Sequence, residues 1–80
     1  MEIKKGSVVI AKAGRDKGKA FTVVDVENSR SVWIADGKRR PLDRPKLKNV
    51  IHLQATAATY DGEMTNRQLR IFLKEYTGGK

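Results

Sequence analysis

The sequence predicts a protein made mainly of β-strands: a small barrel of about five short strands followed by a C-terminal α-helix. Residues 7–12 and 20–26 are rich in Val, Ile, Phe and Thr, as strands are, and a short glycine-containing connection joins them. Apolar residues recur at helical spacing over residues 66–76. A bent sheet closed as a barrel would protect the strand edges. The alternative is a three-stranded open sheet with the helix packed across it.

The chain has 80 residues, a length that supports one domain with a single small core. We expect residues 1–80 to form this domain, with the barrel over about residues 6–54. The sequence has no cysteine and one histidine, so neither disulfides nor a Cys or His metal site is expected. No apolar segment has the length of a membrane span, and the N-terminus lacks an apolar signal sequence. We therefore expect a cytoplasmic protein without metal or cofactor.

The connection between the first two strands, residues 13–19, predicts a hairpin with a charged tip. Gly14 and Gly18 supply backbone conformations that other residues resist, which allows a tight turn. Three basic side chains should then project into solvent. They are Arg15, Lys17 and Lys19. Asp16, in the same loop, is expected to brace it by accepting backbone hydrogen bonds.

The segment after the hairpin predicts a third strand and then an edge segment. Residues 31–35 have strand composition, and the turn dipeptide Asp36-Gly37 should close a hairpin onto the next segment of the chain. Two prolines within residues 38–48 favour an edge strand or an extended loop there. We therefore expect this segment at the margin of the sheet.

Alternation along the edge segment predicts one basic and one apolar side. The basic side contains Arg44, Lys46 and Lys48, and the apolar side contains Leu47, Ile51 and Leu53. Asn49 does not fit the apolar side and indicates a bulge or a turn, while His52 should lie on the polar side. Residues 55–63 are small and polar, and Asp61-Gly62 predicts a turn there.

The helix over residues 66–76 has a clear predicted start. Thr65 and Gln68 have the spacing of a capping box, and Met64 and Leu69 have that of a hydrophobic staple. The side expected to dock on the barrel contains Leu69, Phe72, Leu73 and Tyr76. The side expected to face solvent contains Arg67, Arg70 and Lys74. The residues expected to end the helix are Gly78 and Gly79.

The charge of the chain predicts an acidic partner. Seventeen Lys and Arg against nine Asp and Glu give a formal charge of +8 and a pI near 10.1. Residues 1–54 contain 13 basic and 6 acidic residues, whereas residues 55–80 contain 4 and 3. Because the excess charge belongs to the β-rich part, it indicates a binding surface more than general solubility, and nucleic acid is the usual partner.

The first hairpin resembles a KOW motif, in which a strand, a glycine-containing basic loop and a second strand follow one another. The matching residues are Gly6, Val8-Val9-Ile10, Gly14-Arg15-Asp16-Lys17-Gly18-Lys19 and Val23-Val24-Asp25-Val26. The order is similar to that of KOW-type ribosomal proteins of the archaeal and eukaryotic large subunit, the L-fourteen-e type, and of small bacterial KOW-domain RNA-binding proteins. The resemblance covers about residues 6–54, including the strand that runs into Asp36-Gly37.

This resemblance implies an SH3-like barrel of the KOW type that binds structured RNA, and ribosomal RNA in particular. We expect a monomeric, ribosome-associated protein of translation that contacts no membrane. The residues expected at the RNA are Lys12, Gly14, Arg15, Lys17, Gly18 and Lys19 in the hairpin and Arg39, Arg40, Arg44, Lys46 and Lys48 in the edge segment. The alternative roles are a solubilising turn for the hairpin cations and protection against strand pairing for the edge segment.

Two further features leave alternatives open. Trp33 is expected as partly buried core, with base stacking as the alternative role. No nucleophile and base pair, metal-ligand spacing or phosphate-binding loop is present, so we expect no enzymatic activity. The alternative function is a protein-interaction barrel that docks a transcription or translation factor through residues 38–48.

Overall fold

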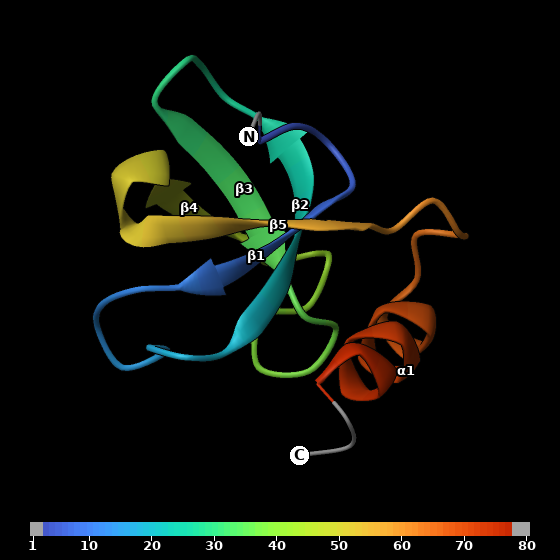
Figure 1. The fold of residues 1–80 in the computed structure, drawn as a ribbon. Helices are drawn as coiled ribbons and strands as arrows, with labels where there is room; N and C mark the ends of the chain where they lie inside the picture. Colours follow the sequence, from blue (N-terminus) through green and yellow to red (C-terminus); the bar gives the residue numbers. More distant parts are fainter. Residues whose placement is uncertain (1–2, 78–80) are drawn as a thin grey trace.

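The computed structural model describes residues 3–77, which form five antiparallel strands and one α-helix (Figure 1). The strands are β1 (Ser7–Ala11), β2 (Ala20–Val26), β3 (Ser31–Ala35), β4 (Lys46–Asn49) and β5 (Leu53–Thr59). A 3₁₀ turn, η1 (Val50–His52), separates β4 from β5, and the helix is α1 (Asn66–Tyr76). The predicted class, mainly β with a C-terminal helix, is confirmed. No helix in the described part of the chain is long and apolar enough to cross a membrane.

The strands follow the order β4-β3-β2-β1-β5 in one sheet, so the alternative of three strands is wrong. The first hairpin pairs Val9 with Phe21, and the second pairs Val23 with Ile34. The sheet is strongly twisted, and β5 crosses in front of the other strands in Figure 1. β4 and β5 are its two edges, since no ladder joins them within residues 3–77.

Apolar residues pack on both faces of this sheet. Alternate residues of β1, β2 and β3, together with Leu53 of β5, form one cluster on the inner face. This cluster contains Val9, Ala11, Phe21, Val23, Val32, Ile34 and Leu53. The other face of β1 and β2 packs against α1, where Val8 and Ala20 meet Leu73. β1 is therefore buried on both sides, which explains its nearly continuous apolar sequence.

The helix begins where the sequence predicts and extends to Tyr76. Thr65 Oγ1 accepts a hydrogen bond from Gln68 N at 3.1 Å, while Thr65 N donates to Glu63 O in place of the second bond of a capping box. Leu69 and Leu73 are buried, and the Phe72 ring lies edge-on to that of Tyr60 with centroids 5.0 Å apart. The expected helix end at Gly78 and Gly79 lies outside the described residues.

Tyr76 is the exception on the docking side of the helix. It is 41% exposed, so its assignment to the core is wrong. Leu73 is the last helix residue in the packed clusters, and the final turn extends beyond them. A face that is apolar in sequence is buried only as far as the sheet reaches beneath it.

The connection from β3 to β4 is longer than a tight hairpin. Asp36 Oδ1 accepts hydrogen bonds from Lys38 N and Arg40 N, both at 2.9 Å, and this closes a local turn. The chain then runs through residues 41–45 to β4, which pairs with β3 as expected. Leu42 N donates to Asn66 Oδ1 at 2.7 Å, so this loop is attached to the start of α1.

The predicted apolar side of the edge segment is mostly wrong. Leu47 is 45% and Ile51 67% exposed, while Leu53 is buried. Strict alternation fails because Asn49 caps η1, its side chain accepting from Ile51 N at 3.0 Å. The turn expected at Asn49 is thus confirmed, and a strand over residues 53–59 forms where the sequence is small and polar. Its pairing with β1 overrides the weak strand signal of its alanines.

Candidate nucleic-acid interface

Four backbone hydrogen bonds close the loop of the β1–β2 hairpin. Ala11 and Lys19 are joined at its base, Gly18 N donates to Ala11 O at 2.8 Å, and two further bonds close the turn inside. Gly14 and Gly18 have φ of +82° and +86°, the left-handed region that favours glycine. The basic side chains of Lys12, Arg15, Lys17 and Lys19 are all exposed. The predicted hairpin with an exposed basic tip is confirmed.

The edge segment lies against this hairpin. Arg40 Nη2 is 3.6 Å from Asp16 Oδ2, which links the β3–β4 connection to the hairpin loop. A Cβ added at Gly14 would lie 3.8 Å from Lys48 Nζ, so the β4 ammonium group also reaches the loop. Two basic segments that are distant in sequence therefore form one surface, which we call the basic surface and define as residues 12–19 and 38–48.

Asp16 acts differently from the prediction. Its carboxylate pairs with Arg40, and its backbone carbonyl accepts from Lys19 N at 2.9 Å, while Asp16 itself is only 8% exposed. The carboxylate thus braces the loop against the neighbouring segment and not against the loop's own amides. Arg40 is in turn held by the protein, with 38% of its side chain exposed.

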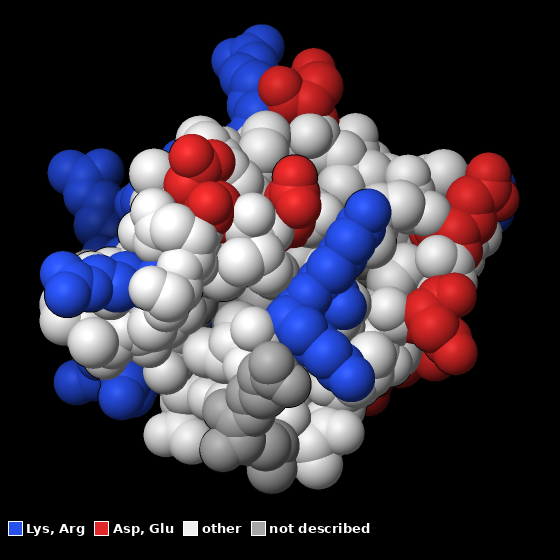
Figure 2. All heavy atoms as spheres, turned by 90° about the horizontal axis from the view of Figure 1, so that it is seen from above, with Lys and Arg blue, Asp and Glu red and all other residues white. Residues whose placement is uncertain are grey.

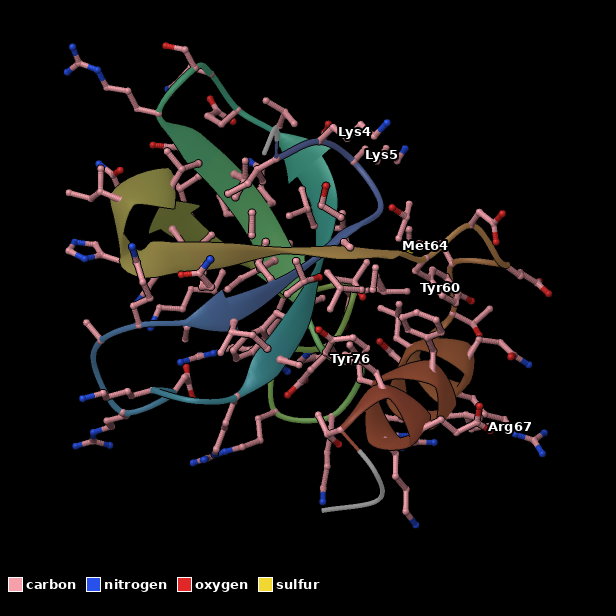
Figure 3. The ribbon with its side chains drawn as sticks, in the orientation of Figure 1. Lys4, Lys5, Tyr60, Met64, Arg67 and Tyr76 are labelled. Carbon is pink, nitrogen blue, oxygen red and sulfur yellow. The ribbon has the colours of Figure 1, made fainter. Side chains whose placement is uncertain are left out.

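The other predicted cations have no carboxylate partner in the described residues, where Arg40 and Asp16 form the one ion pair. Arg39 and Arg44 are exposed, and Lys46 and Lys48 are half-buried. Nitrogen-tipped side chains spread around the hairpin loop at the lower left of Figure 3. Figure 2 looks down on the opposite end of the molecule, where acidic side chains lie among the basic ones. The unpaired cations can therefore meet an external anion.

Three cations outside the predicted set lie at or beside this surface. Lys38, which belongs to the basic surface, and Arg70 and Lys74 of α1 line a groove together with Lys19 and Arg39. The sequence places Arg70 and Lys74 on the solvent side of the helix, and both are exposed. The sequence contains no signal that this side of the helix lies beside the loops, because its position depends on how α1 packs on the sheet.

The remaining singled-out residues lie elsewhere. Trp33 is half-buried on the face of β3 opposite to Val32 and Ile34, and its Nε1 donates to Glu27 Oε1 at 2.9 Å. It pairs across the sheet with the exposed Leu47. His52 is exposed, as predicted. Over residues 3–77, no three His, Cys, Asp or Glu side chains gather in a way that could hold a metal ion.

Comparisons with family models and with curated proteins find no relative of this chain. No family model matches the sequence, and no curated protein matches it either. The resemblance of the first hairpin to KOW proteins therefore stays a prediction based on the hairpin residues.

Proposed function

We propose that this chain is a non-enzymatic RNA-binding protein whose basic surface binds the backbone of structured RNA. The observation that carries the proposal is the joining of two basic segments into one surface by the Arg40 to Asp16 pair and by Lys48 beside Gly14. Together these segments contain ten Lys and Arg and two Asp. Such a concentration of one charge attracts a polyanion and is far more than the sheet needs to protect its edge.

RNA suits this surface better than DNA. The wide, shallow minor groove of A-form RNA presents phosphates and 2′-hydroxyls, which proteins read by shape and charge. A protruding hairpin with unpaired cations can enter such a groove, and the adjoining edge segment can follow one strand of phosphates. We expect little dependence on base sequence, because none of the proposed contacts needs a base edge.

The finer fold assignment belongs to the same proposal. The strongly twisted five-stranded sheet wraps the cluster around Phe21, and η1 connects its two edge strands directly. These features support an SH3-like barrel of the KOW type. With the resemblance of the first hairpin, they support a monomeric, cytoplasmic protein associated with the ribosome, whose ligand is ribosomal RNA.

The salt dependence of binding tests the proposal. With about five phosphates contacted, the logarithm of the association constant should fall against log salt with a slope of about −3 to −4. Fluorescence anisotropy with a ribosomal RNA hairpin from low to moderate salt measures this slope. An affinity that hardly changes with salt would contradict the proposed RNA binding. If the protein, after nuclease treatment, captures a partner protein and shows no affinity for RNA, the alternative of a protein-interaction barrel is favoured instead.

Removal of the Asp16 charge should strengthen RNA binding. Asp16→Asn removes the one negative charge of the hairpin loop, while the backbone hydrogen bonds and the two positive-φ glycines still hold the loop. Because Arg40 is then no longer neutralised, we expect about a two- to fivefold gain in affinity. The matched control is Asp25→Asn, which changes net charge equally at the far, exposed end of β2. Anisotropy titrations measure the RNA affinity of both variants. An equal gain in affinity for both would mean that overall charge, and not the basic surface, governs binding.

A further inference from the structure

A groove runs between the hairpin loop and the helix. Three segments line it: the end of the β1–β2 loop, the turn after β3, and the outer side of α1. The lining residues are Gly18, Lys19, Ala20, Asp36, Lys38, Arg39, Arg70, Ile71, Leu73, Lys74 and Thr77. Its volume is about 1020 Å³, at the upper end of the range for ligand sites. In Figure 1 these segments occupy the lower part of the molecule.

The charge of the groove is almost entirely positive. Five of its lining residues are Lys or Arg, and none of the five is in an ion pair within the described residues. Asp36 is the one acid among them, and its Oδ1 already accepts hydrogen bonds from Lys38 N and Arg40 N. The groove therefore presents unpaired cations to an anionic ligand.

Part of the groove lining is apolar. Ile71 is 43% exposed, and the lining also includes the buried Leu73 and Ala20. A ligand that is both anionic and partly apolar can contact the cations and the apolar part of the lining. A single-stranded nucleic acid has this combination, because its phosphates alternate with riboses and unpaired bases.

The groove and the basic surface differ in shape and therefore suit different ligands. The hairpin loop projects from the molecule (Figure 1), which suits the groove of a duplex. The space between loop and helix is concave, and the domain has Cα extents of only 28 × 22 × 21 Å, which suits one strand better than a duplex. Gly18, Lys19, Lys38 and Arg39 belong to both regions, and Arg39 is next to Arg40, which is paired with Asp16.

We infer that the groove binds a single-stranded RNA segment that leaves the duplex held by the basic surface. The preferred ligand is then a junction between a duplex and a single strand, with Arg70 and Lys74 as phosphate contacts. This inference rests on the proposed RNA-binding function and adds a second site to it.

Two RNA probes and two variants test the inference. The probes are a blunt duplex and the same duplex with a single-stranded overhang of about six nucleotides, within the site sizes of small β domains. Arg70→Gln with Lys74→Gln removes two groove charges. The matched control, Arg30→Gln with Arg67→Gln, removes two exposed charges that do not line the groove. Arg67 points away from the loops in Figure 3.

For the unmodified protein, the overhang should raise affinity about five- to tenfold, the effect of two exposed charge contacts. The groove variant should lose this gain and still bind the blunt duplex equally well, while the control variant should keep the gain. Equal binding of both probes, or a gain that survives in the groove variant, overturns the inference and leaves the proposed function intact. Failure to bind either probe overturns both.

Discussion

Replacing Arg15, Lys17 and Lys19 together by alanine is expected to weaken binding to a blunt RNA duplex by about 10- to 100-fold at moderate salt. Three exposed phosphate contacts, each worth about 0.5–1 kcal/mol, account for this range. The slope of log affinity against log salt should also become less steep by about 2, because fewer counterions are released. Anisotropy titrations at several salt concentrations measure both quantities.

The loop should keep its conformation in this variant. Its shape depends on backbone hydrogen bonds, on two glycines with positive φ and on the Asp16 to Arg40 pair, and none of these uses the three replaced side chains. The melting temperature should therefore change little, which thermal unfolding followed by circular dichroism verifies.

A matched variant separates the hairpin from overall charge. Lys4, Lys5 and Arg30 are exposed cations at the end of the molecule away from the hairpin loop, and Lys4 and Lys5 are labelled in Figure 3. Their replacement by alanine removes the same net charge and should lower affinity by no more than about threefold, through the long-range field alone. An equal loss in the two triple variants would refute a specific role of the hairpin.

The features that the sequence predicts well are governed by local rules. The hairpin follows from two strand-forming segments around Gly14 and Gly18, and the helix start follows from Thr65 at the N-cap. These signals act within a few residues, so distant parts of the chain do not change them. The exposure of the hairpin cations follows in the same way, because Lys and Arg are almost never fully buried unless they are paired.

The features that the sequence does not predict depend on distant contacts. Leu47 is exposed because it lies opposite Trp33, on the face away from the inner cluster, and Ile51 because η1 redirects the chain. The exposure of Tyr76 follows from how far the sheet reaches under the helix. The Arg40 to Asp16 pair and the groove beside Arg70 arise only when three separate segments come together. Charge type could be read from the sequence, but not which charges share a surface.

The close approach of Gly37 to the helix predicts the largest effect on stability. A Cβ at Gly37 would lie 2.2 Å from Asn66 O and 3.0 Å from Asn66 C, both backbone atoms that cannot move aside as a side chain could. Gly37 also has φ of +77°, which costs alanine about 1–2 kcal/mol by itself. We expect Gly37→Ala to lower the free energy of unfolding by about 3 kcal/mol or more, a large part of the total for so small a domain.

Gly18→Ala is the matched control, because Gly18 has φ of +86° but no atom within 4 Å of an added Cβ. It should lose only about 1 kcal/mol, the backbone strain less the gain from a more restricted unfolded chain. Urea unfolding of both variants measures the difference. Equal losses would mean that the turn does not press against α1. A much larger loss for Gly37→Ala would confirm that this contact, with the bond from Leu42 N to Asn66 Oδ1, fixes the helix beside the loops.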